Sequence, residues 1–244
     1  MTKNHIKENK QVSVIFPAYN EVNYINNAVT KVKFLLEEFT SSYEIIIAED
    51  GSTDGTSELA EELSQKDPNV VHIHKDERQG RGKALNNAFL HSKGNIIVYM
   101  DLDLATDVKH LKSLVEALTI EGYDFSTGSR MLPGSQVERT LRRSISSKTY
   151  NFLVRKMLGS KLRDHQCGFK AFRREPALEL INQVNANHWF WDTEIFVRAA
   201  RKGYKIKEIP VVWKSGRKTK VNLFKDSYNM GKQVFSLWRK FKTE

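Results

Sequence analysis

The sequence predicts an α/β protein, built as a single domain around a mainly parallel sheet with helices on both faces. Three observations predict this class. Short apolar segments alternate with segments of helical spacing through the first half of the chain, which is typical of strand–helix–strand units. A length of 244 residues suffices for one α/β domain with a proper core. Polar motifs also follow successive predicted strands, at the edge where open α/β sheets bind ligands.

The elements of the first half follow in order along the chain. Buried strands are predicted at 12–16, 43–48, 70–74 and 95–100, and helices at 23–39, 56–63, 83–91 and 108–118. Pro17 is expected to end the first strand. The first helix is predicted from apolar residues at helical spacing, namely Ile25, Val29, Val32, Leu36 and Phe39.

The pattern changes near residue 124. Strands are predicted at 124–128 and 207–213, helices at 140–158 and 193–202, and a compact segment at 164–170. No linker is visible, so one domain is expected over 12–221. The polar residues 1–11 are expected to form a flexible tail. Residues 222–244 are predicted to form a basic amphipathic helix, and two alternatives stay open for it: it lies at a membrane interface, or it packs on the domain.

The net charge of +10 indicates anionic partners. Nucleotide phosphates, a lipid phosphate and an acidic membrane surface are candidates. Nucleic acid is not expected, since no basic strand interleaved with aromatic residues is present. The single cysteine, Cys167, excludes an internal disulfide framework and fits a reducing compartment. No apolar stretch approaches the ~20 residues that span a bilayer, so the sequence predicts a soluble protein or one peripheral to a membrane.

The most informative motif is Asp101-x-Asp103, which follows a predicted buried strand. Side chains two residues apart leave a strand on the same face, so both carboxylates are expected to point into the ligand-binding crevice. Carboxylate oxygens suit Mg²⁺ or Mn²⁺, which share their coordination with substrate phosphates. The motif therefore favours a metal-assisted enzyme acting on a nucleotide diphosphate. Alternatively, one Asp caps the following helix and the other is solvated.

Two more motifs follow the first and second strands. In the first, Tyr19 can stack on a base, and Glu21 can accept hydrogen bonds from a ribose or base. In the second, Asp50 is placed to accept from a base N–H, while Asp54 or Thr56 is expected to cap the next helix. Each motif alone has an ordinary structural explanation, but their recurrence at successive strand ends predicts one active-site crevice.

A fourth motif, residues 78–84, combines glycines with a predicted helix amino terminus, which suits an anion. Lys83 or Arg81 is expected to add positive charge there.

With these motifs, the chain resembles the inverting glycosyltransferases of family 2, which have the GT-A fold. The resemblance runs from Val12 nearly to the carboxyl end. The second half resembles the polyprenyl-phosphate sugar synthase branch, and most of all the dolichyl-phosphate β-glucosyltransferases. The segments that carry this are Gly128-Ser129-Arg130, Asp164-x-Gln166-Cys167-Gly168-Phe169-Lys170 and Trp191-Asp192-x-Glu194. The resemblance implies a nucleotide half at about 12–123 and an acceptor half at about 124–221.

The resemblance also implies roles for individual residues. Nucleotide-sugar contacts are expected from Pro17, Ala18, Tyr19, Glu21, Asp50, Gly82, Lys83, Asp101 and Leu102. The expected catalytic residues are Asp101, Asp103, Arg130 and Arg143. Asp103 is expected to be the main metal ligand, with Asp101 hydrogen-bonding or acting through water.

The acceptor half is expected to supply cations. Arg130, Arg143 and Lys220 are expected to hold the acceptor phosphate. Gln166, Asp192 and Glu194 are expected to contact the sugar or the acceptor. For the last two acids the alternative is a structural pair with Lys170 or Arg198.

The implied reaction moves a hexose from a nucleotide diphosphate sugar to dolichyl or polyprenyl phosphate, with Mg²⁺ or Mn²⁺, and gives a β-linked product by inversion. A phosphate monoester has a second pKa of about 6, so this acceptor needs no general base. Ala105 stands where mannose synthases usually carry Gln, which favours a UDP-sugar, with UDP-glucose preferred. Open alternatives are a GDP-mannose-dependent synthase, a saccharide acceptor, and a non-catalytic binding module. The protein is expected on the cytoplasmic face of a membrane, bound to its surface or to a membrane-anchored protein partner.

Overall fold

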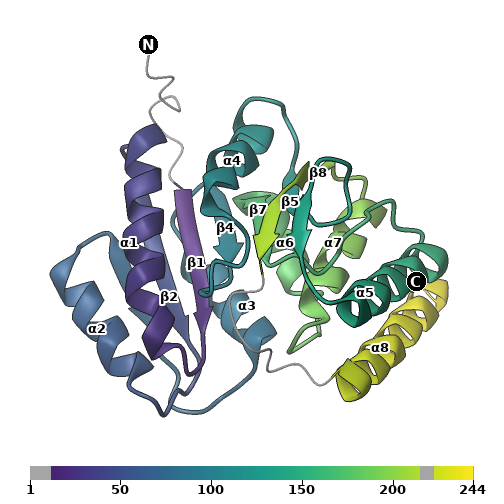
Figure 1. The fold of residues 1–244 in the computed structure, drawn as a ribbon, viewed down its shortest axis with the longest axis horizontal. Helices are drawn as coiled ribbons and strands as arrows, with labels where there is room; N and C mark the ends of the chain where they lie inside the picture. Colours follow the sequence, from purple (N-terminus) through teal and green to yellow (C-terminus); the bar gives the residue numbers. More distant parts are fainter. Residues whose placement is uncertain (1–11, 215–222, 244) are drawn as a thin grey trace.

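The structure, a computed structural model, describes residues 12–214 and 223–243. Its centre is a seven-stranded sheet in the order β3-β2-β1-β4-β7-β5-β8 (Figure 1). The strands are β1 (Val12–Ala18), β2 (Tyr43–Glu49), β3 (Val70–Ile73), β4 (Ile96–Met100), β5 (Phe125–Ser129), β7 (Phe169–Arg173) and β8 (Ile206–Pro210). Every pairing is parallel except those of β7, which runs antiparallel to both β4 and β5. The predicted mainly parallel sheet is confirmed.

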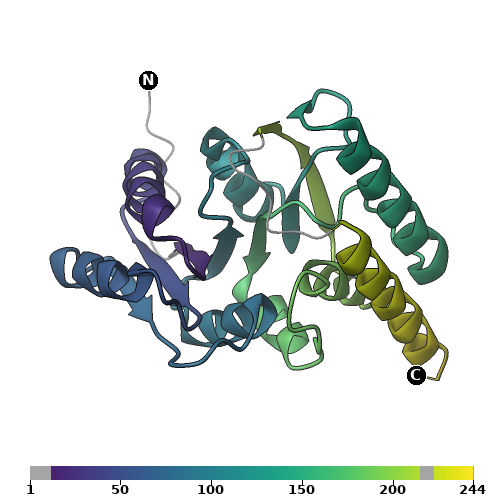
Figure 2. The same cartoon turned by 60° about the horizontal axis from the view of Figure 1, so that its bottom comes forward.

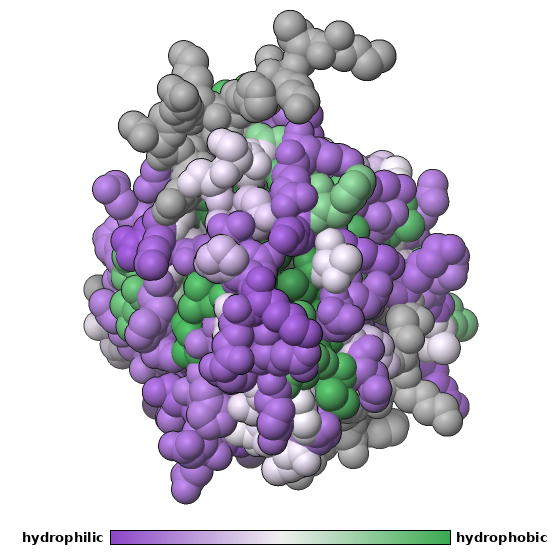
Figure 3. Space-filling view, turned by 90° about the vertical axis from the view of Figure 1, so that its left-hand side faces the viewer, coloured by the Kyte–Doolittle hydropathy of each residue, from purple (hydrophilic) through white to green (hydrophobic). Residues whose placement is uncertain are grey.

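Helices cover both faces of the sheet, as predicted (Figures 1 and 2). They are α1 (Val22–Phe39), α2 (Thr56–Lys66), α3 (Arg81–His91), α4 (Leu111–Thr119), α5 (Leu141–Leu158), α6 (Arg174–Ile181), α7 (Trp191–Arg201) and α8 (Leu223–Thr243). The surface seen from the side of α1 and α2 is mainly hydrophilic (Figure 3).

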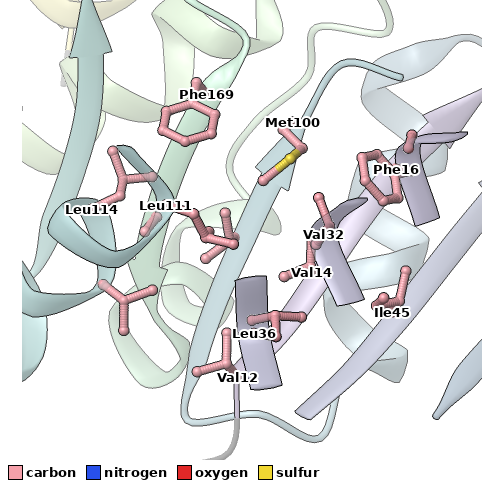
Figure 4. Packing of buried hydrophobic residues seen from close by; sticks show 14 of the residues in the cluster. Val12, Val14, Phe16, Val32, Leu36, Ile45, Met100, Leu111, Leu114 and Phe169 are labelled. Atoms are coloured by element: carbon pink, nitrogen blue, oxygen red, sulfur yellow. The ribbon is translucent and has the colours of Figure 1, made fainter. Parts of the chain in front are cut away.

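Strand alternation divides the core into two layers. Val12, Val14 and Phe16 of β1 pack with α1 and α4 on one face (Figure 4), whereas Ile15 packs on the opposite face with residues of α3, α6 and α7. β4 alternates in the same way, with Tyr99 in the second layer. This period of two is what a strand buried on both faces requires.

Several predicted boundaries need correction. Pro17 lies inside β1 instead of ending it. The expected helix at 108–118 divides into a 3-10 turn, η1 (Val108–His110), and α4. The expected strand at 207–213 divides at Val211 into β8 and β9 (Val212–Lys214), and β9 pairs with the unpredicted β6 (Gln136–Glu138).

Neither β7 nor α6 is predicted from the sequence. β7 carries the charged Lys170 between two buried phenylalanines, so its apolar run is too broken to predict a strand. Lys170 is nevertheless fully buried. Because β7 is reversed, its amino end lies at the edge where its parallel neighbours have their carboxyl ends.

The carboxyl-terminal helix α8 packs beside α5 (Figures 1 and 2). Met230, Val234 and Leu237 are buried against the domain, so packing, one of the two alternatives for this helix, is observed. The predicted boundary at 221/222 lies outside the described residues. Within 12–214 and 223–243, no helix is long and apolar enough to cross a membrane.

Candidate active site

The predicted motifs meet at one edge of the sheet. β1, β2, β4 and β5 run in the same direction, so the residues after Ala18, Glu49, Met100 and Ser129 emerge together. The segment before β7 arrives at the same edge, and the Asp101 N–H donates to the Gly168 carbonyl at 3.2 Å. The reversed strand therefore brings acceptor-half residues to the Asp101-x-Asp103 motif.

The carboxylate of Asp101 lies in a tightly built recess. Its Oδ1 accepts from Arg81 Nη2 at 2.6 Å, and the side chain is 36% exposed. A Cβ added at Gly168 would lie 2.0 Å from Asp101 Oδ2, so glycine leaves the space that this oxygen occupies. The structure thus holds Asp101 from two sides.

Asp103 lies in the turn that follows. Its Oδ1 accepts from the Ala105 N–H at 3.1 Å. Leu104, between them, has φ +48°, a left-handed conformation that a leucine rarely adopts. Helix capping, the alternative role for this acid pair, belongs instead to Asp107, which accepts from the Lys109 N–H at the start of η1.

The motif at residues 78–84 differs in detail from the expectation. Arg81, expected only as an alternative to Lys83, is the cation beside the carboxylates, whereas Lys83 is exposed on α3. The Arg81 guanidinium also donates to Tyr99 Oη at 3.1 Å and lies 4.7 Å from the Trp189 ring centre. Gly82 is buried, and its N–H donates to the Asn187 carbonyl, so packing accounts for the glycine.

Asp50 organises the loop that precedes α3. Its two carboxylate oxygens accept from the N–H groups of Gln79 and Gly80, both at 2.8 Å. Gly80 has φ +102°, which favours glycine. The buried carboxylate therefore shapes the loop, and the predicted base contact would use its remaining lone pairs.

The segment at the end of β1, residues 17–21, lies on the adjacent side of the site. Ala18 is buried at the end of β1, and its carbonyl accepts from the Asp50 N–H at 3.0 Å. The Arg78 guanidinium lies 3.8 Å from the Tyr19 ring centre. Glu21 is buried, and its N–H donates to Thr56 Oγ1 at 2.8 Å. Pro17 lies within β1, and Leu102 is buried behind the acid pair.

On the acceptor side, Arg130 and Asp164 form a buried bidentate pair. Arg130 Nε and Nη2 donate to the two Asp164 oxygens at 2.7 and 2.9 Å. Burial alone would raise the pKa of the Asp164 carboxyl, but the Arg130 charge outweighs it and holds this pKa well below its usual range. Trp213 lies beside the guanidinium, at 5.7 Å. The predicted cation is thus held in a fixed orientation.

A buried network connects the two sides. Lys170 Nζ donates to the Cys167 carbonyl at 2.6 Å and lies 3.6 Å from Asp192 Oδ1. Asp192 in turn accepts from Tyr99 Oη, whose hydroxyl also meets Arg81. The structural alternative for Asp192, a pair with Lys170, is therefore observed. Sequence patterns could not show that Tyr99 takes part, because it looks like any core aromatic residue.

Glu194 is also structural. Its Oε1 accepts from Arg198 Nε at 3.0 Å, and its Oε2 accepts from the N–H groups of Asn185 and Ala186. The alternative of a pair with Arg198 is confirmed, and the Glu194 carboxylate also holds the loop before α7 through these two N–H groups.

The remaining predicted residues lie around this edge. Gln166 donates from Nε2 to Met230 Sδ at 3.4 Å, which links the site to α8. Arg143 is half-buried on α5, and Lys220 lies outside the described residues. Burial raises the pKa of the Cys167 thiol to about 11, so this cysteine is a protonated core residue, as expected.

The acid pair fits a hard divalent cation. Asp101 Oδ2 lies in the recess that Gly168 leaves open, and Asp103 is partly exposed two residues away. Oxygen donors of this kind suit Mg²⁺ and Mn²⁺.

An open α/β sheet that gathers an acid pair, a glycine-rich loop and an oriented arginine at one edge has the architecture of the doubly wound class, whose ligands bind at the carboxyl ends of the strands. The family model of glycosyl transferase family 2 matches residues 13–181, and the chain belongs to that family.

Three curated relatives show the range of the match. Glycosyltransferase AglD from Haloferax volcanii is 47% identical over 230 residues, covering 93% of this chain but 37% of that protein. Dolichyl-phosphate beta-glucosyltransferase from Dictyostelium discoideum is 32% identical, covering 93% of this chain and 73% of that protein. Polyprenol monophosphomannose synthase from Mycolicibacterium smegmatis is 30% identical, and the match covers 85% of this chain and 79% of that protein. The chain therefore spans a little over a third of AglD.

The fold also matches a solved structure. Glucosyl-3-phosphoglycerate synthase from Mycobacterium tuberculosis, in complex with Mn²⁺, UDP and phosphoglyceric acid, gives a TM-score of 0.69 at 21% identity. The match covers 94% of this chain and 78% of that one. At this identity the likeness shows the fold, and it confirms the predicted GT-A architecture.

Proposed function

We propose that this chain transfers a hexose from a nucleotide diphosphate sugar, with UDP-glucose favoured, to dolichyl or polyprenyl phosphate. The observation that carries the proposal is the meeting of Asp101 and Arg130 on one short segment, residues 164–168. Gly168 makes room for the Asp101 carboxylate, and Asp164 orients the Arg130 guanidinium. A donor group and an acceptor phosphate would thus be held side by side. The names of the Dictyostelium and Mycolicibacterium relatives support a lipid phosphate acceptor.

The donor nucleotide would lie against β1, β2 and the loop before α3. Tyr19 offers a ring for stacking, and Glu21 and Asp50 offer acceptors for ribose and base. Arg81 already faces the acid pair and would extend its positive charge toward the diphosphate. These roles follow from the positions of the side chains at the carboxyl edge of the sheet.

Asp103 and Asp101 would hold Mg²⁺ or Mn²⁺. When bound, the cation neutralises charge that develops on the leaving diphosphate. The Arg81–Asp101 pair would hold this carboxylate in one orientation for the cation.

The acceptor phosphate would be held by Arg130, with Arg143 and Lys220 as further cations. A guanidinium suits bidentate contact with phosphate oxygens. The phosphate monoester is already largely a dianion at neutral pH, with a second pKa of about 6, so its oxygen can attack without a general base. In-line attack inverts the anomeric carbon and gives a β-linked product from an α-linked donor.

The surface formed by α5 and α8 suits attachment to an anionic membrane. Leu141, Ile145 and Phe152 are 76, 57 and 60% exposed, and their spacing places them on one face of α5. α5 carries basic side chains and no acidic residue. An apolar stripe among cations is typical of helices that lie at a membrane surface. We place the protein on the cytoplasmic face, and a membrane-anchored partner is a second way to hold it there.

A labelled transfer assay tests the reaction. The protein is incubated with Mg²⁺ or Mn²⁺, a short polyprenyl phosphate, and labelled UDP-glucose, UDP-N-acetylglucosamine or GDP-mannose. Label in the organic phase from UDP-glucose is the expected result. Transfer from GDP-mannose alone would favour the second candidate, a mannose synthase, which the Mycolicibacterium relative represents. No lipid product from any donor would overturn the proposed acceptor and favour a saccharide.

Asp103→Asn supplies the test of the acid pair, and Asp107→Asn is its matched control. Both side chains accept from the N–H two residues later, and Asn keeps an oxygen that can accept there, so both substitutions remove the charge and retain the same local hydrogen bond. Turnover should fall at least about 100-fold in the first variant and stay near wild type in the second. Equal activity in both would exclude the proposed metal role of Asp103 and would assign the chemistry to another catalytic group.

A further inference from the structure

A second cluster of metal-type ligands lies at the outer side of the sheet. Glu49 ends β2, His72 lies in β3, and His74 follows it. One ligand atom from each lies within 4.8 Å of the others. Ile47 pairs with His72 across β2 and β3, so Glu49 and His74, each two residues further on, continue the same face of the sheet.

One atom of this cluster has no partner. The His72 side chain is 6% exposed, and its Nε2 is buried without a hydrogen bond among the described residues. The other ring nitrogen, Nδ1, lies 3.1 Å from Glu61 Oε2 on α2. Glu61 therefore holds the proton at Nδ1 and leaves Nε2 as a lone-pair donor. A buried donor atom of this kind costs stability unless something binds it.

His74 also has a carboxylate at the ring nitrogen that would face away from the ion, and its other nitrogen faces Glu49. Its Nε2 lies 3.2 Å from Asp76 Oδ1, and its Nδ1 lies 2.5 Å from Glu49 Oε2. A histidine that binds a metal through one nitrogen generally donates its other N–H to a carboxylate. Both histidines of the cluster meet this requirement.

Glu49 supplies the negative charge. Its side chain is fully buried, Oε1 accepts from the Ser52 N–H, and Oε2 lies 2.5 Å from His74 Nδ1. Two imidazoles and one carboxylate are a ligand set that zinc takes with its fourth position open. Ser57 Oγ lies 3.2 Å from His74 Nδ1, at the edge of the cluster.

We propose that Glu49, His72 and His74 bind one divalent transition metal ion, with Zn²⁺ as the expected occupant. The site is separate from Asp101 and Asp103, because β1 lies between β2 and β4 and two strand spacings amount to roughly 10 Å. The nitrogen ligands select zinc over Mg²⁺, which prefers oxygen. A proton shared by His74 and Glu49 would satisfy those two residues but would leave His72 Nε2 without a partner.

The metal would fix the base of the loop that Asp50 organises. Glu49 is the neighbour of Asp50, and His74 begins the segment that reaches Gln79 and Gly80, the N–H donors to Asp50. Binding would join β2, β3 and α2 through one ion. The inference does not depend on the proposed transfer reaction, since its test measures metal binding and thermal stability.

The test uses the whole chain, stripped of metal with a chelator. It is titrated with Zn²⁺ by calorimetry in excess Mg²⁺, which keeps oxygen-only sites occupied. One equivalent of Zn²⁺ should bind and raise the Tm. His72→Ala and Glu49→Gln should each weaken binding more than tenfold, whereas Asp103→Asn should leave it unchanged. His91→Ala removes an exposed imidazole and is the control for surface binding.

Glu61→Gln is a variant that should stay folded, because Glu61 is 55% exposed and its replacement leaves the three ligands in place. It should weaken Zn²⁺ binding about tenfold, as removal of an outer carboxylate does in other sites. Binding that is absent in the wild type, unchanged in His72→Ala, or lost in Asp103→Asn would overturn the proposal.

Discussion

Gly168→Ala is the substitution for which the structure makes the sharpest prediction. The new Cβ would lie 2.0 Å from Asp101 Oδ2, whereas real Cβ contacts essentially never fall below 3.0 Å. The carboxylate must therefore move by about 1 Å, and a displacement of that size in an active site costs about 100-fold in rate. Because Gly168 has no positive φ, the effect is steric and not one of backbone conformation. The overpacking should also cost about 1–3 kcal/mol of stability.

The assay compares kcat and metal dependence in Gly168→Ala and Gly231→Ala. A Cβ at Gly231 meets nothing within 4 Å, and this residue lies in helix α8. The control makes the same chemical change without a clash and should stabilise the helix by about 1 kcal/mol. A folded Gly168→Ala variant with wild-type kcat and metal dependence would refute the assignment of Asp101 to the active site.

Three further predictions concern charge and surface. Arg130→Ala should lower the free energy of unfolding in urea by about 3–5 kcal/mol, because it leaves the buried Asp164 carboxylate unpaired. Arg130→Lys should mainly raise the KM for lipid phosphate. An unchanged KM in this variant would exclude Arg130 from the acceptor site. Burial lowers the pKa of His165 from 6.5 to about 3, so the unfolded chain binds the extra proton between these values. Stability should therefore fall as pH drops below 6.5, by up to about 1.4 kcal/mol per pH unit, and His165→Gln should flatten this slope in unfolding measurements. Phe152→Ser should weaken sedimentation with anionic vesicles about tenfold, whereas Phe34→Ser, at a similarly exposed position on α1, should not; equal effects would place the membrane surface elsewhere.

The sequence predicts the nucleotide half well because its strands are uninterrupted apolar runs. β1, β2 and β4 have buried residues on both faces, and their ends agree with prediction to within two residues. β7 is not an uninterrupted apolar run, because Lys170 lies within it. Lys170 is buried through its hydrogen bonds to the Cys167 carbonyl and Thr127 Oγ1, partners that exist only once the sheet has formed. A local pattern cannot contain that information.

The same limit applies to the site. Strand-end position was enough to predict that Asp50, Asp101 and Asp103 lie at one edge of the sheet. It could not decide between Arg81 and Lys83, which differ by two residues at the start of α3 and hence point in different directions from the helix. Helical geometry places Arg81 toward the sheet edge and Lys83 toward solvent.

The reversal of β7 gives the site its organisation. Two guanidinium–carboxylate pairs, Arg81–Asp101 at 2.6 Å and Arg130–Asp164 at 2.7 Å, lie on either side of this strand's amino end. Each pair combines one residue from a parallel strand's end with one partner from elsewhere in the chain. Lys170, fully buried on β7 itself, places a third cation between them. A parallel strand in this place would present Arg173 at that edge and carry residues 164–168 to the opposite one, so neither the Gly168 recess nor the Asp164 anchor would meet the motif that follows β4.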